Sequence, residues 1–116
     1  MSKKIAIFAF NGEMMCFYHA MLNAIDLQDK GNEVSLILEG KATKLITELS
    51  NSECMFNKTY LKLRERKIID CICKACAAKM ETLEEAERQG LKICGDLLGH
   101  PSMSQYLEKG YEIITF

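Results

Sequence analysis

Three cysteines within six residues form the densest group of reactive side chains in this sequence: Cys71, Cys73 and Cys76. A cysteine acts as a nucleophile or a metal ligand only as the thiolate, which a helix N-terminus stabilises through its partial positive charge and free N–H groups. An apolar segment precedes these thiols and a segment of helical periodicity follows them. The sequence therefore predicts sulfur chemistry or metal binding where a strand gives way to a helix.

Three kinds of chemistry fit these thiols. In the first, Cys73 accepts a sulfane sulfur as a persulfide and hands it on, with Cys76 as a resolving or second carrier thiol. In the second, Cys73 and Cys76 form a redox dithiol, because C-x-x-C entering a helix after a strand is the thioredoxin-type arrangement. In the third, four thiolates surround Zn²⁺ or an iron–sulfur cluster, those of Cys71, Cys73, Cys76 and Cys94.

Strand geometry favours the first of these hypotheses over the third. Ligands such as Cys71 and Cys73, two residues apart on one strand face, are separated by about 6 to 7 Å, too far to share one ion on a regular strand. These four cysteines also have an alternative without any chemistry, in which they are small apolar residues buried in the core. That alternative is the expectation for Cys16 and Cys54 taken singly.

The composition predicts a single globular domain over residues 1–116. The chain has 48% hydrophobic residues and one proline, and its length is sufficient to bury a core. Fifteen basic and sixteen acidic residues give a net charge of -1, and no basic block is present. The sequence therefore predicts neither nucleic-acid binding nor attachment to a membrane surface, and favours small molecules or proteins as partners.

The first ten residues, MSKKIAIFAF, combine two lysines with an apolar run, as a signal peptide does. The polar residues 11–13 interrupt this run early, so we expect a buried strand instead. The longest uncharged stretch, residues 14–25, contains His19 and Asn23 and is too short and too polar to span a bilayer. The chain is therefore expected to be cytoplasmic, with no membrane span and with its cysteines reduced.

Short apolar runs alternate with helical patterns along the chain, as in a parallel sheet covered by helices on both faces. Strands are predicted at residues 4–10, 33–38, 67–73, 91–94 and 111–115. Helices are predicted at residues 14–30, 42–51, 60–66, 76–89 and 101–109. The predicted fold is α/β, a three-layer α/β/α sandwich with a mainly parallel five-stranded sheet.

The carboxyl ends of parallel strands meet at one edge of a sheet, where ligands bind in open α/β folds. The residues that follow the predicted strands there are candidate ligand-binding residues: Asn11, Gly12, Glu39 and Gly95, beside the thiols of Cys73 and Cys94. His100 precedes Pro101 in the loop after the fourth predicted strand. His100 therefore has two possible roles: its side chain reaches the cysteines at this edge, or it serves only the turn before Pro101.

Apolar side chains surround most of the predicted helix at residues 14–30: Met14, Met15, Phe17, Tyr18, Met21, Leu22, Ile25 and Leu27. A surface helix normally shows a single apolar stripe. Either this helix lies deep against the sheet, or its outer face is a subunit interface. The second alternative predicts a homo-oligomer, as a dimer, trimer or hexamer.

With these segments assigned, the chain resembles the DsrE/DsrF-like family, small sulfur-relay and sulfur-oxidation proteins with the YchN-like fold. The resemblance covers nearly the whole length. It rests on residues 4–10 (KIAIFAF), 34–40 (VSLILEG), 68–73 (IIDCIC) and 107–116 (LEKGYEIITF), of which the last is the most characteristic.

The resemblance implies that Cys73 carries sulfur as a persulfide, because relay members use the cysteine at the end of this strand. It also implies assembly as trimers or hexamers, some of them heteromeric. The expected function is that of a sulfurtransferase-like carrier, whose partner is a sulfur donor or acceptor protein or a small thiol. No cofactor is favoured, and zinc or an iron–sulfur cluster is the alternative.

Overall fold

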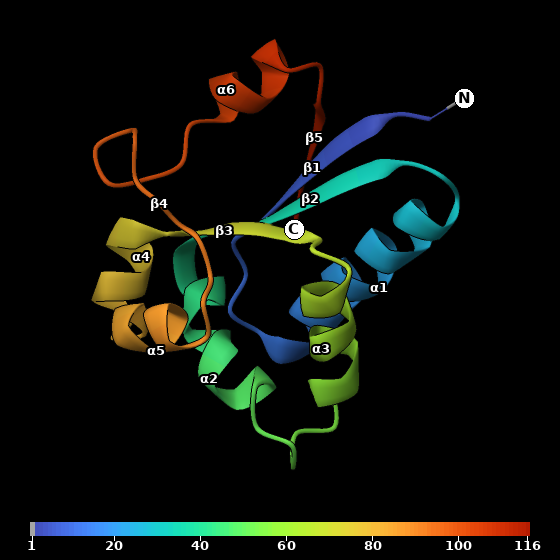
Figure 1. The fold of residues 1–116 in the computed structure, drawn as a ribbon. Coiled ribbons are helices and arrows are strands. Elements are labelled where there is room, and N and C mark those ends of the chain that lie inside the picture. The colour runs from blue at the N-terminus through green and yellow to red at the C-terminus, as the bar shows by residue number, and fades with distance from the viewer. Residues whose placement is uncertain (1) are drawn as a thin grey trace.

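A five-stranded, all-parallel sheet organises the computed structural model, which describes residues 2–116 (Figure 1). The strands follow one another across the sheet as β4 (Ile93–Cys94), β3 (Ile69–Cys73), β2 (Glu33–Leu38), β1 (Lys4–Ala9) and β5 (Glu112–Thr115). Of the three inner strands, β1 and β2 carry mainly apolar side chains and are buried along most of their length. Such runs are typical of parallel strands with helices on both faces, and the α/β prediction is confirmed.

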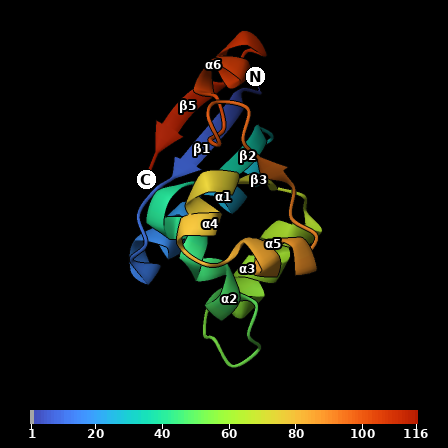
Figure 2. The same ribbon diagram turned by 90° about the vertical axis from the view of Figure 1, so that its left-hand side faces the viewer.

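The helices form two layers of unequal thickness on the sheet (Figures 1 and 2). One face carries α1 (Met14–Asp29), the 3₁₀ helix η1 (Gly40–Leu45), α2 (Ile46–Leu49), α3 (Asn57–Glu65), α4 (Lys74–Lys79) and α5 (Leu83–Arg88). The opposite face carries α6 (Met103–Glu108). Between residues 2 and 116, no helix combines the length and the apolar character that crossing a membrane would require.

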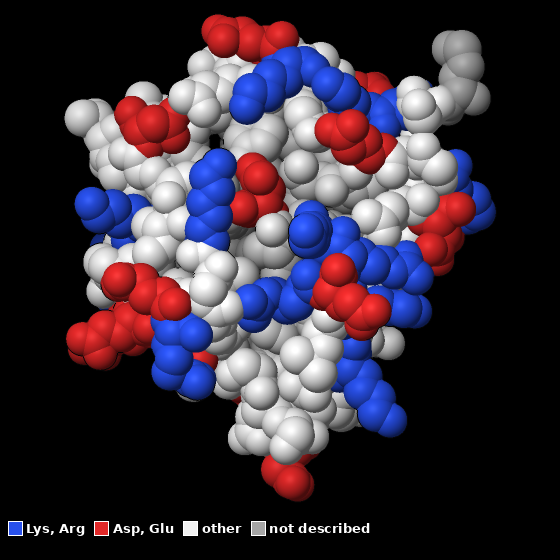
Figure 3. Space-filling view, viewed as in Figure 1, with Lys and Arg blue, Asp and Glu red and all other residues white. Residues whose placement is uncertain are grey.

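Each face of the sheet has its own apolar cluster, because successive strand side chains point to opposite faces. Ile7 and Leu36 belong to the larger cluster, under α1 to α5. Phe8 and Ile37, the next residues along the same strands, belong to the smaller cluster under α6. Acidic and basic side chains lie interspersed across the face shown in Figure 3, without a broad patch of one sign there.

The chain path explains why the two layers differ. From β1 to β4 the strands advance in one direction across the sheet, and right-handed crossovers that advance in one direction lie on one face. After β4 the chain turns back over the other face, through α6, and ends as β5 beside β1. The connections that leave β3 and β4 therefore diverge to opposite faces. Open α/β sheets bind ligands in the crevice at such a switch point.

The prediction of one continuous helix over residues 76–89 is wrong, because this segment is divided between α4 and α5. The break lies at Glu81, whose φ of 61° cannot continue a right-handed helix. The next residue, Thr82, is buried, and its Oγ1 donates a hydrogen bond to the Thr43 carbonyl at 3.0 Å. This bond fixes the turn against η1, and the break brings Ala77 and Ala86 into the larger cluster.

The hydroxyl of Thr82 offers a direct test of this packing. We expect Thr82→Val to lower the free energy of unfolding by about 1–3 kcal/mol, because the Thr43 carbonyl loses a buried donor while the side-chain volume hardly changes. Urea unfolding measures the difference. The control is Thr47→Val on the exposed side of α2, where we expect a change within about 0.5 kcal/mol. Equal effects of the two substitutions would contradict the role of the Thr82 hydrogen bond.

Candidate functional site

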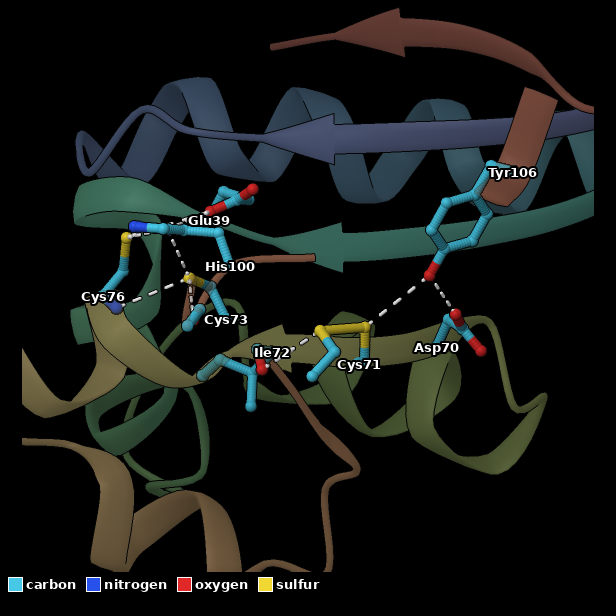
Figure 4. The surroundings of a disulfide bond; sticks show 10 residues. Glu39, Asp70, Cys71, Ile72, Cys73, Cys76, His100 and Tyr106 are labelled. Carbon is cyan, nitrogen blue, oxygen red and sulfur yellow. Dashed lines mark hydrogen bonds and ion pairs between the residues drawn. A yellow bond between two sulfur atoms is a disulfide. The ribbon is translucent and has the colours of Figure 1, made fainter. Parts of the chain in front are cut away.

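Four side chains converge beyond the carboxyl ends of β2 and β3 (Figure 4): Glu39, Cys73, Cys76 and His100. We call them the thiol–histidine cluster. Two sulfurs, an imidazole nitrogen and a carboxylate oxygen lie here within 4.8 Å of one another. They come from the end of β2, the end of β3, the first turn of α4 and the loop before α6. The cluster therefore occupies the switch point that the sheet topology creates.

His100 is the centre of this cluster. Its Nδ1 lies 3.1 Å from the Sγ of Cys73 and 3.8 Å from the Sγ of Cys76. The Oε1 of Glu39 lies 3.7 Å from the same nitrogen and 3.8 Å from the Cys76 sulfur. A histidine nitrogen at hydrogen-bond distance from a thiol can accept its proton, and a nearby carboxylate stabilises the imidazolium that results.

A tight turn in the β4–α6 loop delivers His100 to the thiols. Leu97 and His100 exchange two backbone hydrogen bonds, and the residues between them, Leu98 and Gly99, both have positive φ. The Gly99 carbonyl accepts a hydrogen bond from the Ala75 N–H at 2.8 Å, which ties the turn to the start of α4. A Cβ at position 99 would lie 3.1 Å from the Cβ of Ala75, so glycine permits this close approach.

Cys73 closes β3 and begins α4, and its sulfur accepts a hydrogen bond from the Cys76 N–H at 3.4 Å. Its side chain is completely buried, whereas Cys76 is half-buried. Burial raises the pKa of Cys73 to about 12, an effect that the Cys76 N–H opposes and the Glu39 carboxyl reinforces. The helix start therefore acts on this pKa in the expected direction, but the net shift is upward, because loss of solvent outweighs one N–H donor.

Cys71 and Cys94 form a disulfide, with their Cα atoms 5.9 Å apart. The parallel register pairs Cys73 with Cys94, so Cys71 lies diagonally across the two adjacent strands, within disulfide range. The four-cysteine metal site is therefore wrong, because two of its proposed ligands are bonded to each other. The expectation of six reduced thiols holds for Cys16, Cys54, Cys73 and Cys76 but is wrong for this pair.

A bulge in β3 directs Cys71 toward α6. Leu36 and Ile37, consecutive residues of β2, pair with Ile69 and Cys71, so Asp70 is an extra residue in the ladder. Past the bulge, the side chain of Cys71 joins the smaller apolar cluster. The Asp70 carboxylate accepts a hydrogen bond from the Tyr106 hydroxyl, which fastens α6 over this part of the sheet.

Of the predicted ligand-binding residues, the structure brings Glu39 into the cluster and gives the others different roles. The Oδ1 of Asn11 accepts a hydrogen bond from the Glu13 N–H at 2.8 Å, in the turn that begins α1. A Cβ at Gly12 would meet the Lys41 Cβ at 2.7 Å, and one at Gly95 would meet the Lys74 Cβ at 3.2 Å. Both glycines therefore serve close backbone packing.

The sequence is compatible with a site role or a turn role for His100, and the structure gives this residue both. Its backbone closes the turn with Leu97, and its imidazole contacts the thiols. The available signal was its position in the loop after a strand that lies beside the cysteine-bearing strand. No local motif marks it.

Comparison with known proteins finds archaeal relatives. The chain is 35% identical over 101 residues to the uncharacterized protein MJ0733 of Methanocaldococcus jannaschii, an alignment that covers 87% of this chain and 80% of that protein. Two uncharacterized proteins of Archaeoglobus fulgidus match shorter stretches. One is 54% identical over 43 residues, which cover 37% of this chain and 70% of the relative. The other is 46% identical over 37 residues, which cover 32% of this chain and 100% of the relative. No protein-family model matches the chain, and no solved structure matches it significantly.

The disulfide predicts a measurable stabilisation. Cys71 and Cys94 are 23 residues apart, and by the chain-entropy relation a closed loop of that length contributes about 3 kcal/mol. We expect Cys94→Ala to lower the free energy of unfolding by about this amount relative to the oxidised protein. The Cys54→Ala variant, which removes a free thiol elsewhere, is the control. If Cys94→Ala were as stable as the oxidised, unsubstituted protein, the disulfide would not have the stabilising role assigned to it.

Proposed function

This chain belongs to the same family as MJ0733, and we propose that it acts as a sulfur carrier that holds a sulfane sulfur on Cys73 as a persulfide. The supporting observation is the distance of 3.1 Å between the Cys73 Sγ and the His100 Nδ1. A buried thiol with a raised pKa needs a neighbouring base to become a nucleophile, and His100 is in position to serve as one. The resemblance to the DsrE/DsrF-like proteins is a second support for the proposal, because their sulfur-carrying position matches Cys73.

Loading begins with proton transfer from the Cys73 thiol to the His100 Nδ1. The thiolate attacks the terminal sulfur of a donor persulfide, R–S–SH, so that a new S–S bond forms to Cys73 and the S–S bond of the donor breaks. The departing RS⁻ takes the proton from His100. The sum converts Cys73–SH and R–S–SH into Cys73–S–SH and R–SH, which consumes no oxidant or reductant. Glu39, at 3.7 Å from the same nitrogen, stabilises the transient imidazolium.

Cys76 provides the route between the buried thiol and a partner. It is half-buried, and its sulfur lies within 4.8 Å of the completely buried sulfur of Cys73. A Cys76 thiolate can attack the terminal sulfur of Cys73–S–SH, which gives Cys76–S–SH and restores the Cys73 thiolate. The sulfur then passes to an acceptor thiol by the same exchange. Donor and acceptor, a protein or a small thiol, accordingly approach from the side of Cys76.

The same pair of thiols supports a second candidate, a C-x-x-C redox module. Both thiols are free, and their sulfurs lie within 4.8 Å of each other. In this case a disulfide substrate is reduced to two thiols while Cys73 and Cys76 are oxidised to a disulfide. The product on the protein separates the candidates, since a persulfide adds one sulfur and a disulfide removes two hydrogens.

A cytoplasmic location is part of the carrier proposal, because persulfide chemistry uses reduced thiols. In the Cys71–Cys94 disulfide, Cys71 is 1% exposed, which protects its sulfur from attack by reducing thiols, whereas Cys94 is partly exposed. The carrier is expected to act in the manner of a sulfurtransferase, with both cluster thiols restored after each transfer.

Sulfur loading tests the carrier proposal. After incubation with a persulfide donor, we expect intact-protein mass spectrometry to show a gain of about 32 Da that maps to Cys73 or Cys76. Cys73→Ser should abolish stable loading, and His100→Asn should slow it by about 10²- to 10⁴-fold, because the base is lost. Cys54→Ser is the matched control and should load normally. Undiminished loading of Cys73→Ser would contradict the proposal, and a loss of about 2 Da at this pair would favour the redox candidate.

Self-association is the further part of this proposal. Helix α1 buries Phe17 and Met21 but leaves Met15 50% and Leu22 42% exposed, which is compatible with an apolar subunit interface. We expect light scattering to give a mass of at least two chains of 13.2 kDa each, and Leu22→Glu to shift it toward one chain. Thr47→Glu, on the exposed side of α2, is the control. A strict monomer at high micromolar concentration would contradict the interface.

A further inference from the structure

The thiol–histidine cluster also has the donor set of a metal centre, and we propose that Glu39, Cys73, Cys76 and His100 bind one Zn²⁺ ion. In a tetrahedral zinc site, Zn–S bonds of about 2.3 Å and Zn–N or Zn–O bonds of about 2.0–2.1 Å leave adjacent ligand atoms about 3.3–3.8 Å apart. Four contacts within the cluster are 3.1, 3.7, 3.8 and 3.8 Å. All four ligand atoms lie within 4.8 Å of one another, so modest side-chain adjustments complete the coordination.

The burial of Glu39 points to a cation. Its carboxyl belongs to a residue that is 6% exposed, and the structure gives it the Cys76 thiol and the His100 imidazole as neighbours, each beyond 3.6 Å. A buried carboxylate is costly without a positive partner. His100 supplies that charge only when protonated, whereas a divalent ion at the centre of the cluster supplies it in every protonation state of the imidazole.

The backbone holds the four ligands independently of any ion. Cys73 and Cys76 are spaced as C-x-x-C at the start of α4, with the Cys76 N–H donating to the Cys73 sulfur. The turn that carries His100 is fixed by the hydrogen bond between the Gly99 carbonyl and the Ala75 N–H. Glu39 follows β2, and its own N–H donates to the Ala9 carbonyl at 2.8 Å. A site held in this way requires little rearrangement to receive an ion.

The chemistry of the donors selects zinc. Two thiolate ligands argue against Mg²⁺ and Ca²⁺, which prefer oxygen ligands. An iron–sulfur cluster is typically held by four cysteines rather than two. Two sulfurs, one nitrogen and one oxygen complete a tetrahedral sphere without an open position for water. Binding releases the protons of Cys73 and Cys76, as Zn²⁺ + 2 Cys–SH → Zn(Cys–S)₂ + 2 H⁺. The inference goes beyond sulfur carriage and does not rest on it, since it requires only the donor set.

Metal titration of the chelator-treated protein tests the site. We expect one Zn²⁺ per chain in competition with a chromophoric chelator, and a gain of about 63 Da in native mass spectrometry, which is zinc less two protons. Co²⁺ in place of Zn²⁺ should give the thiolate-to-cobalt charge-transfer band and the intense visible bands of tetrahedral coordination. The absence of stoichiometric zinc from the unsubstituted protein, or a cobalt spectrum without thiolate bands, would overturn the proposal.

Substitutions assign the ligands. Cys73→Ser, His100→Ala and Glu39→Gln should each weaken zinc binding by more than about 100-fold, beyond the 10- to 100-fold typical of outer-shell partners. Cys54→Ser and Glu48→Gln, which change a thiol and a carboxylate outside the cluster, should retain the affinity of the unsubstituted protein. Glu39→Gln keeps the side-chain volume, and circular dichroism checks that it is folded. Unchanged affinity in Glu39→Gln would remove the carboxylate ligand and overturn the four-residue site.

Different experimental outcomes contradict the carrier proposal and the zinc proposal. Sulfur loading is measured in parallel on the metal-free, unsubstituted protein. Loading without zinc binding contradicts only the metal site, whereas zinc binding without loading contradicts only the carrier function. If both hold, preloading with zinc should block the gain of sulfur, because zinc and a persulfide require the same Cys73 sulfur.

Discussion

Parallel pairing of β2, β3 and β4 is the constraint on which the chemistry of this protein depends. It brings the carboxyl ends of these strands to one edge of the sheet, so that Glu39 and Cys73 lie beside each other although 34 residues separate them. Because the chain leaves β3 toward α4 and β4 toward α6, the edge opens at this point, and the β4–α6 loop can place His100 there. The same pairing sets the distance between Cys71 and Cys94.

Burial determines what the central thiol can do. Cys73 is completely enclosed, and its pKa is raised to about 12, so the isolated side chain is a neutral thiol at physiological pH. Its reactivity thus depends on a neighbour that takes or replaces the proton. The geometry offers His100 at 3.1 Å as a base and the four-residue donor set as a place for a cation. The proposed sulfur carriage and the proposed zinc binding both rest on this dependence.

Four of the cysteines divide into two pairs with different roles, although one pair lies within the sequence span of the other. Cys71 and Cys94 lie on neighbouring strands, and their disulfide joins an edge strand of only two residues to the sheet. Cys73 and Cys76 belong to the start of α4 and remain free. Sequence spacing alone does not separate these pairs, because all four residues lie near strand ends that the sheet brings together.

Periodicity and chain order by themselves determined the α/β class, the five strands and the edge at which Glu39 and Cys73 meet, because strand patterns are local and parallel strands share one polarity. Tertiary structure alone decided the rest. The bulge at Asp70, the disulfide and the turn that carries His100 depend on interstrand register and on contacts between distant segments. The division of residues 76–89 into α4 and α5 likewise depends on the hydrogen bond from the Thr82 hydroxyl to the Thr43 carbonyl. The raised pKa of Cys73 depends on the burial of its side chain. None of these is encoded in a short window of sequence, since each arises only when separate segments pack.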